Sequence, residues 1–301
     1  MPAAGADARR KETRARCIAA SSLDSGPPGT TVRAARRLNR ATGLLATSVL
    51  LDSGIEHYRG SFKNGFMFAP PVVSALTLAV SAHGTADSRP LAHRARQAVF
   101  SAAAITGLAG TGFHLYNVCK RPGRLAWQNL FYGAPLGAPM AILLAGLLGA
   151  AAEEVRHTAA GRSARVLGLP AGRLLAAVSG VGILGTVAEA ALLHFRGAYH
   201  NPAMYAPITV PPVSAALLLG AAASASPRRG RIARAWLRVT ALLGFAGVGF
   251  HIFGVARNMG GWRNWTQNVL NGPPLPAPPS FTGLALAGLA ALRLLQDRAH
   301  D

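Results

Sequence analysis

The stretch that decides the fold is GIEHYRGSFKNGFMFAPPVVSAL at residues 54–76, because its pattern returns as ALLHFRGAYHNPAMYAPITVPPVSAAL at residues 191–217. The two copies are separated by 137 positions, as His57 and His194 illustrate. An internal repeat fixes the architecture, because each copy forms one comparable unit. We therefore predict two tandem copies of one domain. Two further pairs of segments match, GLAGTGFHLYNV at 107–118 with GFAGVGFHIFGV at 244–255, and WQNLFYGAPLGAP at 127–139 with WTQNVLNGPPLPAP at 265–278.

Composition indicates that both copies lie in a membrane. Half of the chain is hydrophobic, 14% is charged, and the charges lie between long apolar stretches. Several stretches approach the ~20 residues that a helix needs to span a bilayer, and a soluble helical protein would need polar helix faces, which residues 99–113 lack. We predict an all-α integral membrane protein with eight transmembrane helices, four in each copy. They are expected at 41–60, 69–83, 97–117, 134–152, 174–196, 209–225, 236–256 and 278–295.

The positive charges predict the orientation. The segments on the side of the N-terminus carry 23 of the 31 Lys and Arg residues, and the opposite loops carry eight. Because short cytoplasmic loops are rich in Lys and Arg, both termini are predicted to be cytoplasmic, in a cell inner membrane. Four helices per copy is an even number, so the copies are parallel and related by a pseudo-twofold axis along the membrane normal. The net charge of +20 thus reflects topology and attraction to the lipid bilayer, and no nucleic-acid binding is expected.

The repeat also sets the domain boundaries. Residues 1–37 are rich in Arg, Ala, Ser and Gly without apolar periodicity, which predicts a disordered basic cytoplasmic tail. The first four-helix membrane repeat is placed at residues 38–155 and the second at residues 171–298. The proline pairs Pro70–Pro71 and Pro211–Pro212 are predicted to start helices, a position where proline is tolerated.

Two carboxylates occupy matching positions inside the predicted membrane helices. Asp52 and Glu189 lie 137 residues apart, each in the first helix of its repeat. An ionisable group within a membrane segment is costly unless it is paired or hydrated, so such residues are functional candidates. The alternative is that the two acids neutralise Arg59 and Arg196 near the outer interface, because a long arginine side chain can reach back along its helix.

Four histidines form two matching pairs. His57 and His194 lie near the outer end of the first helix of each repeat, and His114 and His251 lie near the outer end of the third. These helices run in the same direction, so the four rings are expected at a similar depth. Two imidazoles from neighbouring helices are what axial ligation of a b-type haem requires.

The same residues would also suit a transition metal. Asp52 or Glu189 would complete a site of two histidines and one carboxylate. The fit is imperfect, because a spacing of five residues rotates about 140° around a helix, so Asp52 and His57 do not share a face. Arg59 and Arg196 are expected to hold haem propionates, or a substrate carboxylate or quinone oxygen.

Further matched residues surround these candidates. Asn64 and Asn201 follow the first histidine of each copy, and Gln128–Asn129 and Gln267–Asn268 follow an outer-loop tryptophan. They fit either a polar outer vestibule or ordinary loop capping beside tryptophans that anchor the interface. A set of glycines predicts tight helix packing just below the third-helix histidines. These are Gly107, Gly110 and Gly112, with their copies Gly244, Gly247 and Gly249.

Two functions from different classes remain open. In the first, the protein is a redox or metal-site membrane subunit that holds haem b or a transition metal near the outer face and passes electrons between a quinone and a periplasmic or extracellular partner. This plan resembles, by analogy, membrane cytochrome b-type and quinol-oxidising anchor subunits. In the second, it is a transporter or channel-like protein that binds a small solute at the repeat interface and uses its acids and histidines to handle protons. The inner halves of the helices carry few ionisable groups, which favours the first.

Overall fold

The computed structural model describes residues 29–133, 135–159, 162–224 and 226–297, and helices dominate them. One small hairpin of two-residue strands, β1 (Arg165–Val166) with β2 (Leu169–Pro170), lies between the halves, and the other regular elements of the described chain are helices, which confirms the all-α prediction. The long helices are α2 (Thr30–Arg59), α3 (Ala69–Ala86), α4 (Arg94–Cys119), α6 (Gly137–Arg156), α7 (Ala171–Arg196), α8 (Ala206–Ala223), α9 (Pro227–Arg257) and α11 (Pro279–Asp297). Short turns and helices lie between them: η1 (Gly65–Phe68), α5 (Trp127–Tyr132), η2 (Pro202–Tyr205), η3 (Gly261–Asn264) and α10 (Trp265–Asn271).

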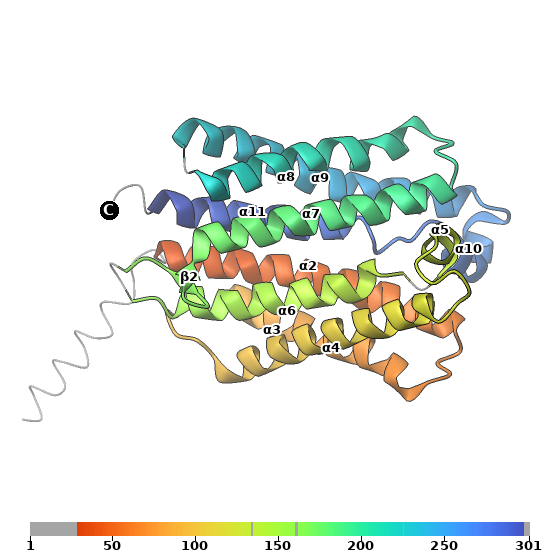
Figure 1. The fold of residues 1–301 in the computed structure, drawn as a ribbon, viewed down its shortest axis with the longest axis horizontal. Coiled ribbons are helices and arrows are strands. Elements are labelled where there is room, and N and C mark those ends of the chain that lie inside the picture. The colour runs from red at the N-terminus through yellow and green to blue at the C-terminus, as the bar shows by residue number, and fades with distance from the viewer. Residues whose placement is uncertain (1–28, 134, 160–161, 225, 298–301) are drawn as a thin grey trace, which may run out of the picture.

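The long helices form two four-helix bundles (Figure 1). In the first bundle, α2 and α4 each pack against α3 and α6. In the second bundle, α7 and α9 each pack against α8 and α11. The order of elements in the first half recurs in the second, with η3 as one additional 3₁₀ turn. The bundles meet along α2 and α11, and through a smaller contact between α6 and α7.

The contact between α2 and α11 forms the centre of the molecule. Leu45 of α2 and Leu284 of α11 are completely buried. A Cβ atom on Gly283 of α11 would lie 3.0 Å from the carbonyl oxygen of Ala41 of α2, so the two helices approach closely. Small residues at helix contacts are typical of packing in lipid, where close approach of backbones replaces the hydrophobic effect.

Six helical segments of the described chain are long and apolar enough to cross a membrane, which indicates a multi-pass membrane protein. Their outer surfaces expose large apolar side chains such as Leu108 and Leu242. The most central helices, α2 and α11, are not among the six, and α2 carries four arginines in its first three turns. The six segments are Gly65–Ala86, Arg94–Cys119, Gly137–Arg156, Ala171–Arg196, Pro202–Ala223 and Arg228–Arg257.

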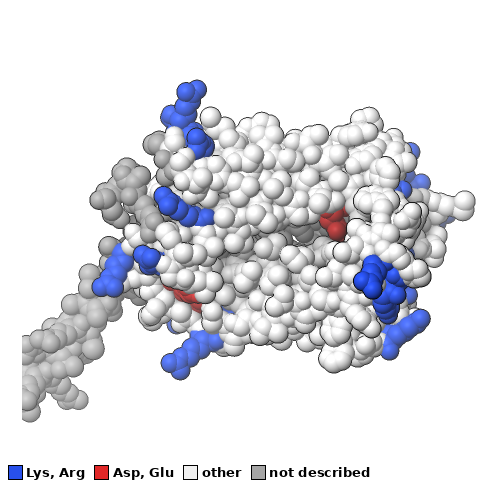
Figure 2. Space-filling view, in the orientation of Figure 1, with Lys and Arg blue, Asp and Glu red and all other residues white. Residues whose placement is uncertain are grey.

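We name the two ends of the bundle after the predicted orientation. The inner end carries the start of α2 and the end of α11, which lie on the same side of the molecule (Figure 1). The outer end carries the connections with α5 and α10 (Figure 1). Figure 2 shows Lys and Arg gathered at these two ends, with a largely uncharged band between them on the visible face. Such a band is what a lipid-facing surface requires.

The first helix begins earlier than the sequence pattern predicts. Residues 30–37, expected in the tail, form the first two turns of α2, because Val32, Ala34 and Ala35 are buried against the bundle. Residues 1–28 of the predicted tail lie outside the described residues.

The second proline prediction was wrong. Pro70 lies in the first turn of α3, as predicted for that pair. Pro211 and Pro212 lie inside α8, which starts at Ala206. The helix starts there because η2 runs directly into it, as η1 runs into α3, and Pro207 takes the first-turn position that Pro70 takes in the first half.

Candidate functional site

The first histidine pair lies at the outer end of the first bundle. His57 is in the last turn of α2, and its Nδ1 lies 2.5 Å from the backbone oxygen of Met67 in η1. His114, in the last two turns of α4, is hydrogen-bonded through Nδ1 to the backbone oxygen of Pro135, just before α6. The two rings are close enough to interact electrostatically. Helices α2 and α4 thus each carry one predicted ligand at the outer end of the first bundle.

The second half repeats this arrangement. His194 Nδ1 in α7 lies 2.7 Å from the backbone oxygen of Met204 in η2. His251 Nδ1 in α9 lies 2.6 Å from the backbone oxygen of Pro274, before α11. These two rings also interact electrostatically with each other. Each bundle thus carries two of the four histidines at its outer end.

These contacts fix the tautomer of all four rings. A backbone carbonyl can only accept a hydrogen bond, so each Nδ1 carries the proton and each Nε2 keeps a free lone pair. Among the described residues, no hydrogen bond occupies Nε2 of any of the four rings. Histidines that bind a metal through Nε2 usually donate Nδ1–H to a carbonyl or carboxylate oxygen, as these four rings do.

An identical turn positions the first histidine of each pair. Ser61 and Phe62 follow α2 with φ values of 57° and 44°, and Ala198 and Tyr199 follow α7 with φ values of 57° and 45°. Two consecutive left-handed residues that are not glycine are uncommon, and they reverse the chain sharply. The reversal returns the next 3₁₀ turn to the helix end and places its backbone oxygen on the histidine ring.

The asparagines in this turn have a local role. Asn64 Oδ1 accepts a hydrogen bond from the backbone nitrogen of Phe66 at 3.0 Å and caps η1. Asn201 Oδ1 accepts one from Ala203 at 2.9 Å and caps η2. Asn64 and Asn201 therefore cap the 3₁₀ turns, as expected for ordinary loop capping.

The asparagines of the longer outer loops also hold backbone. Asn129 Nδ2 donates to the carbonyl oxygens of Pro122 and Arg124, each at 2.8 Å. Asn268 Nδ2 donates to the oxygen of Gly261 at 2.8 Å and to that of Met259 at 3.3 Å. No hydrogen bond of the side chains of Gln128 and Gln267 is found among the described residues.

The two candidate arginines differ in their contacts. Arg59 makes an exposed salt bridge of 2.8 Å with Glu56, one turn earlier in α2. The guanidinium of Arg196 lies over the ring of Phe131 in α5, 5.6 Å from its centroid, and interacts electrostatically with Glu189. Each arginine lies at the outer end of its bundle, two residues after the first histidine.

The two membrane carboxylates lie near each other at the junction of the bundles. Asp52 of α2 interacts electrostatically with Glu189 of α7 and with Glu56. Glu189 is hydrogen-bonded to the backbone of Gly137, the first residue of α6. A Cβ atom on Gly137 would lie 2.8 Å from Cδ of Glu189, so the carboxylate is packed onto the helix start. Both acids are half-buried, and no salt bridge joins Asp52 to Arg59 in the described chain.

The glycines below the third-helix histidines have two distinct roles. A Cβ atom on Gly107 would lie 2.3 Å from the backbone nitrogen of Leu143, and one on Gly110 would lie 3.2 Å from Pro139, so these glycines allow α4 to touch α6. A Cβ atom on Gly112 would meet nothing within 4 Å. In the second half, Gly244 and Gly247 face Thr282 and Pro278, and Gly249 faces open space.

The donor set of each bundle is a pair of imidazoles. No group of three or more His, Cys, Asp or Glu side chains that could hold a metal ion occurs in the described ranges. Each bundle therefore offers two imidazole nitrogens that no hydrogen bond occupies.

A buried ionic network at the inner end was not predicted from the sequence. Arg96 of α4 is 1% exposed and binds both carboxylate oxygens of Glu153 of α6, at 2.8 and 2.9 Å. It also donates to Asp87, at the end of α3, at 2.9 Å. Hydrogen bonds from Arg89 and Arg96 hold the pKa of the Asp87 carboxyl well below its usual range, although burial opposes them. Arg156, also buried, donates to the backbone oxygens of Gly84, Asp87 and Arg89.

This network belongs to the first bundle alone. The residues that align in the second half with Asp87, Arg96 and Glu153 are Ser224, Ala233 and Leu292. The signal in the sequence was the presence of opposite charges at the inner ends of three successive apolar stretches. It ties the α3–α4 connection to α6, away from the histidines.

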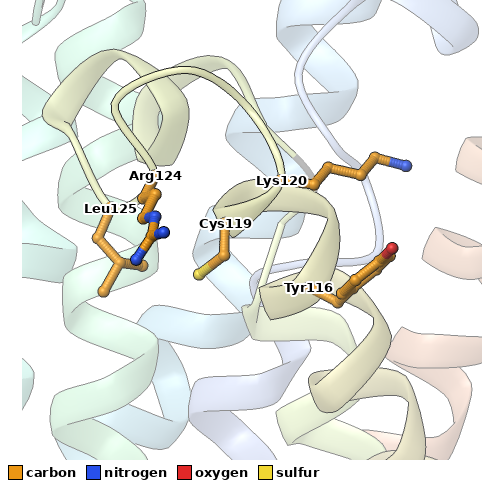
Figure 3. A pocket seen from close by; sticks show the side chains of 5 residues that line it. All are labelled: Tyr116, Cys119, Lys120, Arg124 and Leu125. Atoms are coloured by element: carbon orange, nitrogen blue, oxygen red, sulfur yellow. The ribbon is translucent and has the colours of Figure 1, made fainter.

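A shallow depression lies beside the outer end of α4 (Figure 3). It is lined by Tyr116, Cys119, Lys120, Arg124 and Leu125, which Figure 3 shows at the end of α4 and in the loop that follows it. None of the four paired histidines lines it, so it is separate from the candidate site.

Comparison with known proteins yields no relative. No protein-family model, curated protein or solved structure matches the chain. The class of the protein therefore rests on its own fold, a helical multi-pass membrane protein with one histidine pair in each of two bundles.

Proposed function

We propose that the chain is an eight-span inner-membrane protein built from two parallel four-helix repeats, residues 38–155 and 171–298, with both termini in the cytoplasm. The recurring order of elements and the matched hydrogen bonds of the histidines support a structural repeat. Helices α2 and α11 have 30 and 19 residues, enough to cross a bilayer. They contact protein on most sides, so they need less apolar surface than the six outer spans.

We further propose that each repeat holds one redox-active group, haem b or a transition-metal ion, through its histidine pair. His57 and His114 would provide the ligands in the first half, and His194 and His251 in the second. The observation that carries this proposal is the hydrogen bond from each Nδ1 to a backbone oxygen, which directs a free Nε2 lone pair away from the loop. A haem bound there would supply one-electron transfer.

The surroundings fit electron transfer at the outer face. Arg59 and Arg196 lie at the outer ends of α2 and α7, where they would hold haem propionates or a quinone oxygen. The outer loops contain Lys63, Lys120 and Arg124 but no acidic residue, so an acidic periplasmic or extracellular partner would bind there. A quinone would reach the sites from the bilayer.

Absorption spectroscopy of the purified full chain in detergent tests this function. We expect a Soret band and sharpened α and β bands on reduction with dithionite, or one metal ion per histidine pair by elemental analysis. His57→Ala should lower the bound group, whereas His200→Ala, an exposed histidine at the same end, should not. A spectrum and metal content that are unchanged by His57→Ala and His194→Ala together would exclude these ligands.

A second candidate function rests on the carboxylates. The approach of Asp52 to Glu189 at the junction of the bundles fits a proton-coupled transporter that binds a small solute at the repeat interface. Reconstituted vesicles with an internal pH dye test this directly. A transporter would give a proton flux that Glu189→Gln abolishes while the redox spectrum is retained.

A further inference from the structure

Four arginines from three helices converge at the inner end of the molecule. Arg37 and Arg40 lie in the first three turns of α2, Arg293 lies in the last two turns of α11, and Arg238 lies in the inner half of α9. The charges of the other three arginines act on the Arg37 guanidinium. Helix α11 packs on both α2 and α9, which brings the side chains of the three helices to one surface. We call these four residues the arginine cluster.

No acidic side chain neutralises the arginine cluster within the described ranges. The salt bridges there involve Arg59, Arg89, Arg96 and Arg156, and none involves a member of the cluster. Like charges held near one another repel, and partial burial strengthens the repulsion by lowering the local dielectric. Arg37 is half-buried. An anion bound at the cluster would therefore lower the electrostatic free energy of the four arginines.

The other half of the chain provides an internal control. The residues aligned with Arg37, Arg40 and Arg238 are Leu174, Ala177 and Ser101, and the residue aligned with Arg293 is Glu154. A general excess of positive charge on the cytoplasmic side would affect both halves alike. The concentration of arginine on one of two equivalent faces therefore points to a ligand of that face.

An apolar track continues from the cluster along the membrane. Leu242 and Phe245 follow Arg238 by four and seven residues, so all three lie on one face of α9. Leu242 is 69% exposed and Phe245 is 58% exposed. Helix α9 has 31 residues and is therefore about 46 Å long, against ~30 Å of hydrocarbon, so its inner end extends beyond the hydrocarbon. Arg238 lies at the inner edge of the predicted span 236–256, from which its long side chain reaches the headgroups.

We propose that the arginine cluster binds the phosphate of an anionic phospholipid of the inner leaflet, with the acyl chains lying along Leu242 and Phe245. Guanidinium groups match phosphate oxygens in geometry and charge, and the exposed apolar residues match the chains. Phosphatidylglycerol has this chemistry, with one negatively charged phosphate and two acyl chains, and serves as the probe. The proposal rests on the membrane orientation and is independent of the histidine sites.

Lipid titration of the full chain tests the proposal. The purified protein in mixed micelles is titrated with phosphatidylglycerol, phosphatidylcholine or sodium phosphate while the thermal unfolding midpoint is followed, and bound lipid is counted by native mass spectrometry. Phosphatidylglycerol should raise the midpoint and remain bound, because a ligand of the folded state stabilises it. Arg40→Gln with Arg238→Gln should weaken its apparent affinity about tenfold or more.

Two variants control for charge and folding. Arg94→Gln with Arg162→Gln removes the same charge from exposed inner-end positions outside the cluster and should change the affinity by less than about twofold. Arg40→Lys with Arg238→Lys keeps the charge and should retain most of the binding. This variant keeps the test decisive where the glutamine variant folds poorly. An equal response to phosphatidylcholine, an undiminished affinity in the glutamine variant, or a full stabilisation by sodium phosphate alone would overturn the proposal. The redox spectrum should be the same in all these variants, which separates this test from that of the histidine sites.

Discussion

Glu189 of α7 is packed against Gly137 at the start of α6, so a carboxylate of the second bundle meets a helix N-terminus of the first. The partial positive charge of a helix N-terminus stabilises an anion there. This contact joins the two bundles in addition to the larger contact of α2 with α11. It also explains how an acid is kept within a membrane segment without a direct salt bridge.

The contact predicts the effect of a methyl group at Gly137. In Gly137→Ala, the new Cβ would meet the flexible end of Glu189, which can move aside at small cost. We expect a loss of the carboxylate–helix interaction of about 0.3–1 kcal/mol and no loss of the bundle. A double-mutant cycle with Glu189→Gln, measured by chemical unfolding in detergent, should give a coupling of this size. Strictly additive effects would show that the two residues do not interact.

The glycines of α4 allow a matched comparison. Gly107→Ala places a methyl group 2.3 Å from the backbone of Leu143, which cannot move independently of α6. We expect destabilisation by about 1–3 kcal/mol or more. Gly112→Ala meets nothing within 4 Å and should be neutral or stabilising by about 0.5–1 kcal/mol, since alanine favours the helix. Gly244→Ala and Gly249→Ala should reproduce this difference in the second half. Chemical unfolding in detergent measures the difference, and equal unfolding midpoints of the two variants within a pair would contradict the close packing at Gly107 and Gly244.

The inner ionic network predicts a pH dependence. The folded-state pKa of Asp87 is lowered below the value of ~3.9 expected in an unfolded chain. Its contribution to stability is therefore complete above pH ~4 and is lost as the pH falls toward the folded-state pKa. The difference in unfolding free energy between wild type and Asp87→Asn should be constant from about pH 5 to 7 and shrink below about pH 4.

The control for this pH series is an exposed acid. Glu56→Gln removes a solvent-exposed salt bridge to Arg59 and should change stability by less than about 1 kcal/mol throughout. An Asp87→Asn difference that grows on acidification would show that Asp87 is not stabilised as its carboxylate.

The orientation is tested with the two native cysteines. Cys119 lines the open depression at the outer end and should react with an impermeant maleimide added to the periplasmic side of whole spheroplasts. Cys17, in the predicted cytoplasmic tail, should react only after permeabilisation, and Cys119→Ser should remove the outside signal. The reverse pattern would invert the topology.

The sequence predicted the helical class and the positions of the long helices because apolar length and the repeat are local signals. It also named the paired histidines, since the repeat shows which polar residues recur. It could not show that Asn64 caps η1, because that role depends on the left-handed turn at Ser61 and Phe62. The prediction for Pro211 failed because α8 starts at a position set by η2 rather than by the proline pair.

Contacts between distant segments were the least predictable. The network around Arg96 joins residues up to 72 positions apart and lacks a counterpart in the second half, so the repeat gave no indication of it. The arginine cluster likewise requires knowledge that α11 lies between α2 and α9. In both cases, the sequence shows only arginines on the cytoplasmic side, and their partners become known only from the packing of the helices.

The most direct test of the central claim is the number of bound redox groups per chain in single-bundle variants. We predict two haem groups or metal ions in the wild type, one in His57→Ala or in His194→Ala, and none when both are combined, with His200→Ala retaining two. A wild-type preparation that binds two such groups and keeps both when His57 and His194 are replaced together would contradict the account.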